Sequence, residues 1–238
     1  MQSWCNWQPR STQNAVPKGV RVRCPHSVLQ KTKKMKEVKD TCYKGTRILI
    51  GNEKRAIINR MIDYLIANGY QEIIIPIIQY QETFTGKVGQ ENNNLMFNFK
   101  DRGDRDVCLA PEYTAVVQKL AGTAFKLQKD VKLFYVQECF RGEKPQAGRY
   151  RQFTQFGVEI LNPSKDYGKE LEYLAYELIS TVRADIKVNT DVTRGLTYYK
   201  EGKGFEITCE ALGSSKQVAG GGSYEGGVGF AIGIDRII

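Results

Sequence analysis

The chain has 238 residues, of which 41% are hydrophobic, which is enough for one globular domain with a sizeable buried core. The formal net charge is +9, but seven of the 35 basic residues lie in residues 1–34, which leaves 28 basic and 26 acidic residues in the remainder. Because no apolar run is long enough to cross a membrane and the N-terminus lacks the pattern of a secretory signal, we expect a cytoplasmic protein with no membrane partner.

The cysteines form neither a CxxC pair nor a pair with histidine at metal-ligand spacing. There are six of them, widely scattered: Cys5, Cys24, Cys42, Cys108, Cys139 and Cys209. This pattern indicates neither a disulfide framework nor a zinc site, so we expect free thiols.

Residues 1–34 differ in composition from the rest of the chain. They contain no acidic residue, they hold both tryptophans and the only histidine, and their periodicity fits neither helix nor strand. We expect this leader to be disordered, and two interpretations stay open. It is either a basic tail that holds RNA or the translation of an upstream tRNA gene.

The second interpretation of the leader rests on its possible codons. Residues 20–27 can be encoded by a sequence that folds into the stem and loop of a tRNA T-arm, and residues 4–8 and 11–15 allow two further arms. On this hypothesis translation starts at Met35, and the nucleotide sequence is the test.

From Met35 onward, apolar periodicity predicts a succession of helices and strands. Residues 54–68 have the spacing of an amphipathic helix that ends at Asn68-Gly69. The β-branched run 72–79 predicts a strand, and Pro76 restricts it to an edge or an interface. Alternation over residues 95–109 predicts a hairpin.

The second half of the chain continues with a helix over 114–120, a strand over 131–140 and one helix over 166–184. Between the last two, residues 140–160 read FRGEKPQAGRYRQFTQFGVEI, which predicts two strands flanking a basic loop. The planar fork of arginine suits phosphate oxygens, so this loop is a candidate phosphate site.

Several blocks of the chain, in order, resemble the motifs of class II aminoacyl-tRNA synthetases of the histidyl type, a resemblance that extends from about residue 44 to residue 238. Residues 54–79 resemble motif 1, 140–160 resemble motif 2 and 229–236 resemble motif 3, while 193–199 and 219–225 resemble the two histidine signatures of that family. The signatures depart from the usual residues at Thr197, Ser223 and Glu225.

The resemblance implies a fold, a nucleotide and a set of phosphate ligands. The expected fold is α+β, with an antiparallel sheet of about six strands flanked by helices over residues 35–238, as a homodimer through the motif 1 region. ATP is the implied cofactor, with Mg²⁺, whose ligands the sequence does not locate. By motif matching, Arg141 binds the α-phosphate, Arg236 binds the γ-phosphate, Phe153 stacks on adenine and Glu143 accepts a hydrogen bond from its amino group. Arg194 is expected beside the α-phosphate and the substrate carboxylate.

The resemblance also implies the pocket for histidine. This substrate needs an anion for its ammonium group and polar partners for both imidazole nitrogens. Matching positions are Glu112 and Thr114 for the amino group, with the others around the ring: Gln155, Glu159, Tyr198, Tyr199 and Tyr224. The acceptor end of tRNA-His is expected to contact Gln146, Arg149 and Arg151. Ala110 and Tyr113 depart from the usual arginine and glycine.

Two domains of the family have no counterpart in the chain, so we expect a bare catalytic core. Only 33 residues separate Ile160 from Arg194, where the family carries an inserted domain, and the chain ends in motif 3, before the anticodon-binding domain. Three functions remain open. They are a minimal histidine–tRNA ligase, an enzyme that passes histidine to an acceptor other than tRNA, and a non-catalytic paralogue that acts as a regulatory or binding subunit.

Overall fold

The computed structural model describes residues 35–38, 42–87, 89, 93–145, 148–192, 196, 198–212 and 216–238. Contacts divide the chain into two units, Met1–Gln30 and Lys31–Ile238, and all the described residues belong to the second. The predicted leader, residues 1–34, lies outside the described residues.

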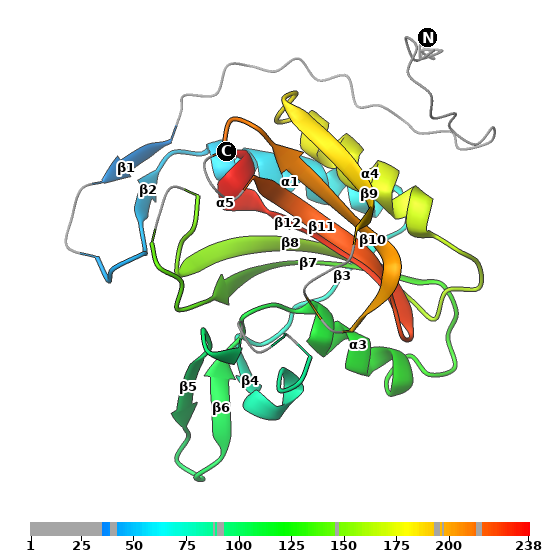
Figure 1. Ribbon diagram of the computed structural model, residues 1–238, viewed down its shortest axis with the longest axis horizontal. Helices are drawn as coiled ribbons and strands as arrows, with labels where there is room; N and C mark the ends of the chain where they lie inside the picture. The colour runs from blue at the N-terminus through cyan, green and yellow to red at the C-terminus, as the bar shows by residue number, and fades with distance from the viewer. Residues whose placement is uncertain are drawn as a thin grey trace. The chain divides into compact units, whose positions relative to one another are not determined.

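A seven-stranded sheet forms the centre of the second unit (Figure 1). Its six long strands are all antiparallel to their neighbours, and the two-residue strand β3 adds to one edge in parallel with β7. The predicted α+β fold with a six-stranded antiparallel sheet is therefore confirmed, with one short parallel strand added. In spatial order the strands are β3 (Gln71–Glu72), β7 (Val131–Phe140), β8 (Gln152–Leu161), β12 (Gly227–Gly233), β11 (Gln217–Tyr224), β10 (Tyr199–Cys209) and β9 (Ile186–Val192).

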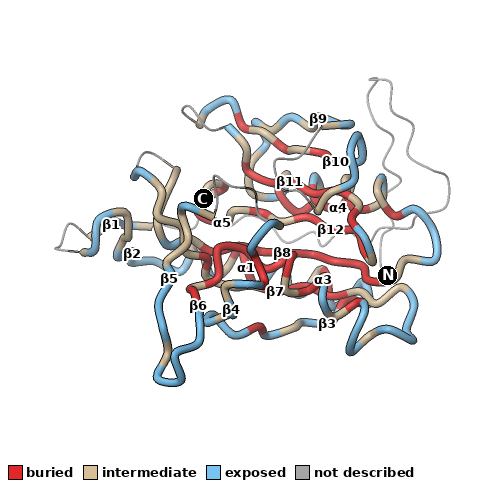
Figure 2. The backbone as a smooth tube through the Cα atoms, turned by 60° about the horizontal axis from the view of Figure 1, so that its bottom comes forward, coloured by how far each residue is buried: buried red, intermediate tan, exposed pale blue. Residues whose placement is uncertain are grey.

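Helices cover both faces of this sheet because successive strand residues point to opposite sides. Helices α1 (Glu53–Ala67) and α4 (Gly168–Ser180) pack on one face, where Phe134 contributes to their apolar core. Helix α3 (Thr114–Gly122) packs on the other face with the next residue along β7, Tyr135. Figure 2 shows that the buried positions follow the central strands and the inner sides of these helices. The three predicted helices are confirmed to within a few residues at their ends.

The predicted strand 72–79 is wrong as a single element. Pro76 has no N–H to donate to a ladder, and the chain divides around it. The first part is β3 of the central sheet, whereas the second part, β4 (Ile78–Tyr80), joins a separate three-stranded sheet. The predicted hairpin completes that sheet as β5 (Phe97–Lys100) and β6 (Asp106–Leu109), and a 3-10 helix, η1 (Gln81–Thr83), follows β4.

Two small elements lie near the ends of the described chain. A hairpin of β1 (Lys36–Val38) and β2 (Ile48–Ile50) precedes α1. Helix α5 (Ile234–Ile237) follows β12. Among the described residues, no helix combines the length and the apolar character needed to cross a membrane.

Candidate active site

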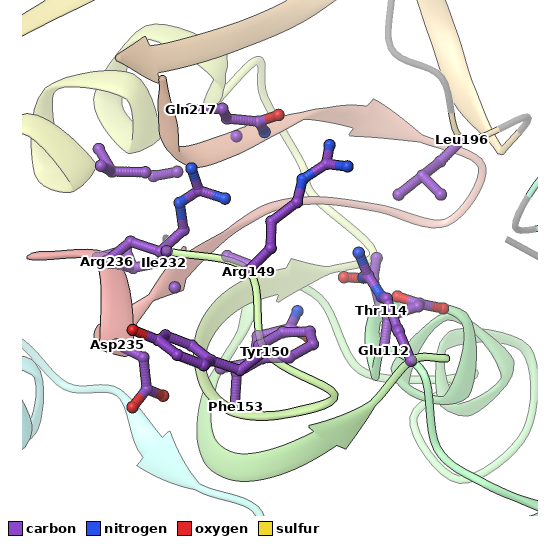
Figure 3. A pocket seen from close by; sticks show the side chains of 18 of the residues that line it. Glu112, Thr114, Arg149, Tyr150, Phe153, Leu196, Gln217, Ile232, Asp235 and Arg236 are labelled. Atoms are coloured by element: carbon purple, nitrogen blue, oxygen red, sulfur yellow. The ribbon is translucent and has the colours of Figure 1, made fainter. Parts of the chain in front are cut away.

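A cavity of about 310 Å³ opens beside β8, β10, β11 and β12 (Figure 3). It is lined by side chains from the turn before α3, from the basic loop between β7 and β8, and from α5. Most of the site residues predicted from the sequence lie on its wall: Glu112, Thr114, Arg141, Glu143, Arg149, Phe153, Gln155, Tyr198, Tyr199 and Arg236. Segments far apart in the chain are thus brought to one cavity.

One end of the cavity, here called the cationic end, carries Arg149 and Arg236 beside Glu143, with Arg141 on its side toward Glu112. Arg149 donates from Nη1 to Glu143 Oε2 over 3.2 Å. Burial is the main cause that lowers the pKa of Arg236, and the positive charge of Arg149 lowers it further. In Figure 3 the guanidinium groups of Arg149 and Arg236 point into the same part of the cavity. Such an arrangement of cations is suited to an anion with several oxygens, such as a polyphosphate.

Arg141 and Phe153 lie across the mouth of the β7–β8 hairpin. The Arg141 side chain is oriented by a hydrogen bond from Nε to the Pro111 carbonyl, 2.8 Å long, and its guanidinium carbon is 5.3 Å from the Phe153 ring centroid. Phe153 pairs with Cys139 in the ladder, so the strand register fixes the place of its ring. An aromatic face next to a guanidinium group can stack on a planar base.

The opposite end, here called the carboxylate end, contains two buried glutamates bridged by Thr114. Thr114 Oγ1 donates to Glu159 Oε1 over 2.8 Å, and Tyr224 OH donates to Glu159 Oε2 over 2.8 Å. Glu112 accepts from the Ala115 backbone N–H over 3.0 Å and from Tyr198 OH over 3.1 Å. Each carboxylate therefore has fixed partners, all of them neutral donors.

Burial of these two carboxyl groups changes their protonation. The pKa of Glu159 is raised from its usual 4.5 to about 8. Desolvation is the main cause, the hydrogen bonds from Tyr224 and Thr114 act in the opposite direction, and the charge of Glu112 adds to the rise. Desolvation also raises the pKa of Glu112, while the hydrogen bond from Ala115 and the charge of Arg141 lower it. A low-dielectric site with two acidic groups favours a ligand that brings a positive charge or several N–H donors.

Between the two ends, Gln155, Tyr198 and Tyr199 complete the wall, and Tyr224 lies behind them. Gln155 Nε2 donates to Tyr135 OH over 3.0 Å and its Oε1 accepts from Cys139 Sγ over 2.8 Å, so the amide is locked in one orientation. The Tyr198 and Tyr199 ring centroids are 4.7 Å apart, and the Tyr224 ring lies within 6.3 Å of both. The result is a rigid aromatic surround for a small planar group.

The remaining predicted site residues do not line the cavity. Glu159 and Tyr224 lie directly behind its wall, and the Arg151 side chain is engaged with Tyr43 and the Glu143 carbonyl at 2.9 and 3.0 Å. Arg194 and Gln146 lie outside the described residues. The sequence analysis missed Tyr150, Gln217 and Asp235, which do line the cavity. Asp235 could have been found from the sequence, because it directly precedes Arg236, which was expected to bind phosphate.

No group of three or more His, Cys, Asp or Glu side chains in the described part of the chain is arranged to hold a metal ion. The described cysteines, namely Cys42, Cys108, Cys139 and Cys209, are free thiols, in line with the sequence analysis.

The fold is that of the class II aminoacyl-tRNA synthetases. The apo histidyl-tRNA synthetase of S. aureus superposes with a TM-score of 0.67 at 24% identity, over 83% of this chain and 69% of that one. An ATP phosphoribosyltransferase regulatory subunit/histidyl-tRNA synthetase from Bacillus halodurans gives a TM-score of 0.68 at 15% identity, over 85% and 83%.

Sequence comparison narrows this class to one family. The histidyl-tRNA synthetase family model matches residues 51–176. The histidine–tRNA ligase of Archaeoglobus fulgidus is 29% identical over 82% of this chain and 74% of its own length, and that of Methanosarcina acetivorans is 34% identical over 74% and 48%. The chain belongs to the histidyl-tRNA synthetase family. It spans about half the length of the Methanosarcina relative.

Proposed function

We propose that this chain activates histidine with ATP to form histidyl-adenylate and transfers the histidyl group to the 3′ end of tRNA-His. One observation carries the proposal: a single cavity joins a cationic end to a carboxylate end that is buried and rich in hydroxyl donors. The two ends are complementary in charge to the two substrates, because ATP is a polyanion and histidine carries an ammonium group and an imidazole.

In this proposal the cationic end holds ATP. Arg141 binds the α-phosphate, Arg236 binds the γ-phosphate, and the Phe153 ring stacks on adenine, whose amino group Glu143 accepts. Activation is attack of a histidine carboxylate oxygen on the α-phosphorus, with pyrophosphate leaving, so positioning and charge stabilisation suffice without a general base. Arg194 is assigned beside the attacked phosphate. Mg²⁺ would supply further charge stabilisation on the phosphates, and we assign it no protein ligands.

The carboxylate end holds histidine. Glu112 and Thr114 receive the ammonium group, and the imidazole lies among Gln155, Tyr199 and Tyr224, with Glu159 behind them. A buried N–H left without a partner costs about 1–3 kcal/mol, so an amino acid of similar size without ring nitrogens is rejected.

The acceptor end of tRNA-His is assigned to the basic loop through Gln146, Arg149 and Arg151. Because the Arg151 guanidinium group already bonds Tyr43 and the Glu143 carbonyl, its contribution includes holding the loop in shape. We place the reaction in the cytoplasm.

A homodimer is part of the proposal. The segment that resembles motif 1 exposes Ile74, at 83% of its surface, together with Ile78 and Tyr80. An apolar patch of this kind on a soluble domain is typical of a subunit interface. Ile74→Asp is expected to shift the protein to monomers in sedimentation at micromolar concentration, whereas Leu127→Asp, an exposed apolar position outside the segment that resembles motif 1, leaves assembly unchanged.

Histidine-dependent exchange of pyrophosphate into ATP tests the activation step. Exchange that depends on histidine, and that is lost in Arg194→Ala at unchanged melting temperature, supports it. A folded parent without exchange contradicts it and favours the regulatory paralogue, the second candidate, because the Bacillus halodurans neighbour carries that description. Charging of tRNA-His, with and without its extra 5′ guanosine, then separates tRNA from another acceptor.

A further inference from the structure

Residues 43–54, here called the brace, run alongside two segments that carry cationic side chains into the cavity. They come just before or at the start of α1, and most of them precede the region matched by the family model, which begins at residue 51. Apart from the bond between Tyr43 and Arg151, the function proposed above gives the brace no role.

The first contact of the brace is with the basic loop. The Arg151 backbone N–H donates to the Gly45 carbonyl over 2.7 Å, and Arg151 Nη1 donates to Tyr43 OH over 2.9 Å. A Cβ at Gly45 would lie 2.8 Å from Arg151 Cγ and 3.0 Å from Pro145 Cγ, and the φ of Gly45 is +88°. Only glycine fits such a close approach in this conformation, so the brace and the loop are built to touch.

The second contact joins the loop to α5 through one side chain. Arg47 donates from Nη1 to Tyr150 OH over 2.9 Å, with its guanidinium carbon 3.6 Å from the centroid of the same ring. From Nη2 it donates to Asp235 Oδ1 over 2.7 Å. One planar group therefore holds the residue after Arg149 and the residue before Arg236.

Asp235 is the point at which these contacts converge. Its side chain is only 5% exposed, and it accepts from Arg47, from Lys54 Nζ over 3.1 Å and from the Thr154 backbone N–H over 2.6 Å. A buried carboxylate with two cations and a backbone donor is fixed in place, and the loss of one cation leaves it poorly compensated. This anchor therefore fixes the first turn of α5 against β8, to which Thr154 belongs.

We propose that Arg47 is a positioning residue for polyphosphate binding, which fixes the loop that carries Arg149 and the helix that carries Arg236. The two guanidinium groups share one part of the cavity and repel each other before the anion arrives (Figure 3). A framework that holds them together in advance removes the ordering cost from the binding step. The positioning role of Arg47 rests on the proposed function only in taking ATP as the polyphosphate.

Arg47→Ala is expected to raise the KM for ATP in pyrophosphate exchange by about tenfold, and to leave the KM for histidine within about twofold. The hydrogen bonds described for Glu112 and Glu159, at the carboxylate end, all go to residues outside the brace: Thr114, Ala115, Tyr198 and Tyr224. We therefore expect the KM for ATP to change without the KM for histidine. Arg47→Lys keeps a charge beside Asp235 but lacks the planar fork, so a rise of about threefold is expected. Arg60→Ala, an exposed arginine on α1, is the matched control and should leave both constants unchanged.

Titration calorimetry with ATP, in parallel with the exchange assay, makes the two proposals separable. ATP binding that weakens about tenfold in Arg47→Ala supports the positioning role even if the parent shows no exchange, which would contradict only the proposed function. If Arg47→Ala fails to fold, Tyr150→Phe removes the hydroxyl acceptor alone and should still weaken ATP binding. A KM or Kd for ATP within twofold of the parent overturns the proposal. A rise of similar size in both KM values, together with a fall in kcat and in melting temperature, would show that Arg47 has a merely structural role. That result would overturn the proposal as well.

Discussion

The cationic end and the carboxylate end of the cavity are built in different ways. At the cationic end, Arg149 belongs to a loop and Arg236 to α5, and a residue next to each of them bonds Arg47 of the brace. At the carboxylate end, Glu159 lies on the long strand β8, fully buried, with Thr114 and Tyr224 as fixed donors.

This difference suggests a division of work between the two ends. Discrimination between a small amino acid and its analogues requires hydrogen-bond partners with fixed positions, and a buried strand provides them. A polyphosphate is bound by charges that must also release pyrophosphate, and side chains on a loop can adjust to both states. Substitutions that change only one end are therefore the sharpest tests of this difference between the two ends.

The largest effect is expected at the cationic end, from Arg141→Ala. Loss of a charged donor at the attacked phosphate should lower the rate of pyrophosphate exchange by about 10²- to 10³-fold. Arg141→Lys keeps the charge but not the fork, and should recover only part of the rate. Steady-state exchange assays on both variants measure this, with melting temperature as the control for folding, because Arg141 also bonds the Pro111 carbonyl. A loss of less than tenfold in Arg141→Ala would count against its assignment.

The next effect in size concerns the framework of the carboxylate end. Gly229 pairs with Glu159 across the β12–β8 ladder, and a Cβ at Gly229 would lie 2.7 Å from the Val158 carbonyl and would overlap the Glu159 carboxyl group. Gly229→Ala should lower the free energy of unfolding by about 3 kcal/mol through overpacking. Gly122→Ala, at a helical position with open space around it, should leave stability unchanged or slightly higher. Urea unfolding curves compare the two, and equal stabilities would show that the ladder can relax.

Much of the fold could be predicted from the sequence because its periodic elements carry the apolar core. The strand of residues 131–140 and the helix of residues 54–68 follow directly from their patterns, since burial of one face determines both. Strand β11 is harder to predict because Gly220, Gly221 and Gly222 have no side chain to alternate. A Cβ at Gly221 would lie 2.3 Å from the Gly229 carbonyl, so the glycines there serve close packing that appears only when the strands meet.

The site divides in the same way. Motif matching pointed to Arg141, Glu112 and Tyr198, which line one cavity. Their roles stay predictions. Arg47 could not be found, because it acts through partners more than a hundred residues away in the chain, and a lone basic residue before a helix carries no signal of such contacts.

The pH dependence of stability tests the carboxylate end in a second way. Burial raises the pKa of Glu159 from 4.5 to about 8, so the folded protein keeps a proton that the unfolded chain releases above pH 4.5. The stabilisation is present in full below that pH and is lost as pH rises to about 8, at up to about 1.4 kcal/mol per pH unit. Glu159→Gln cannot titrate, so its stability should fall less steeply between pH 6 and 8.

Urea unfolding of both proteins at three pH values in this window measures the difference. Glu112, whose pKa burial also raises, leaves some slope in the variant. Parallel curves for the parent and for Glu159→Gln would show that Glu159 is ionised in the folded protein at pH 6, contrary to the buried site described above.

The smallest effect is expected from the removal of residues 1–34. On the hypothesis that they are a translated tRNA gene, a chain that starts at Met35 should keep the exchange constants and the KM for tRNA within about twofold of the full chain. The other interpretation, a basic tail that holds RNA, predicts an unchanged exchange but a KM for tRNA that rises and depends less on salt. Charging assays at two salt concentrations therefore decide between the two interpretations. The exchange constants serve as the internal reference, because both proteins contain the cationic end of the cavity.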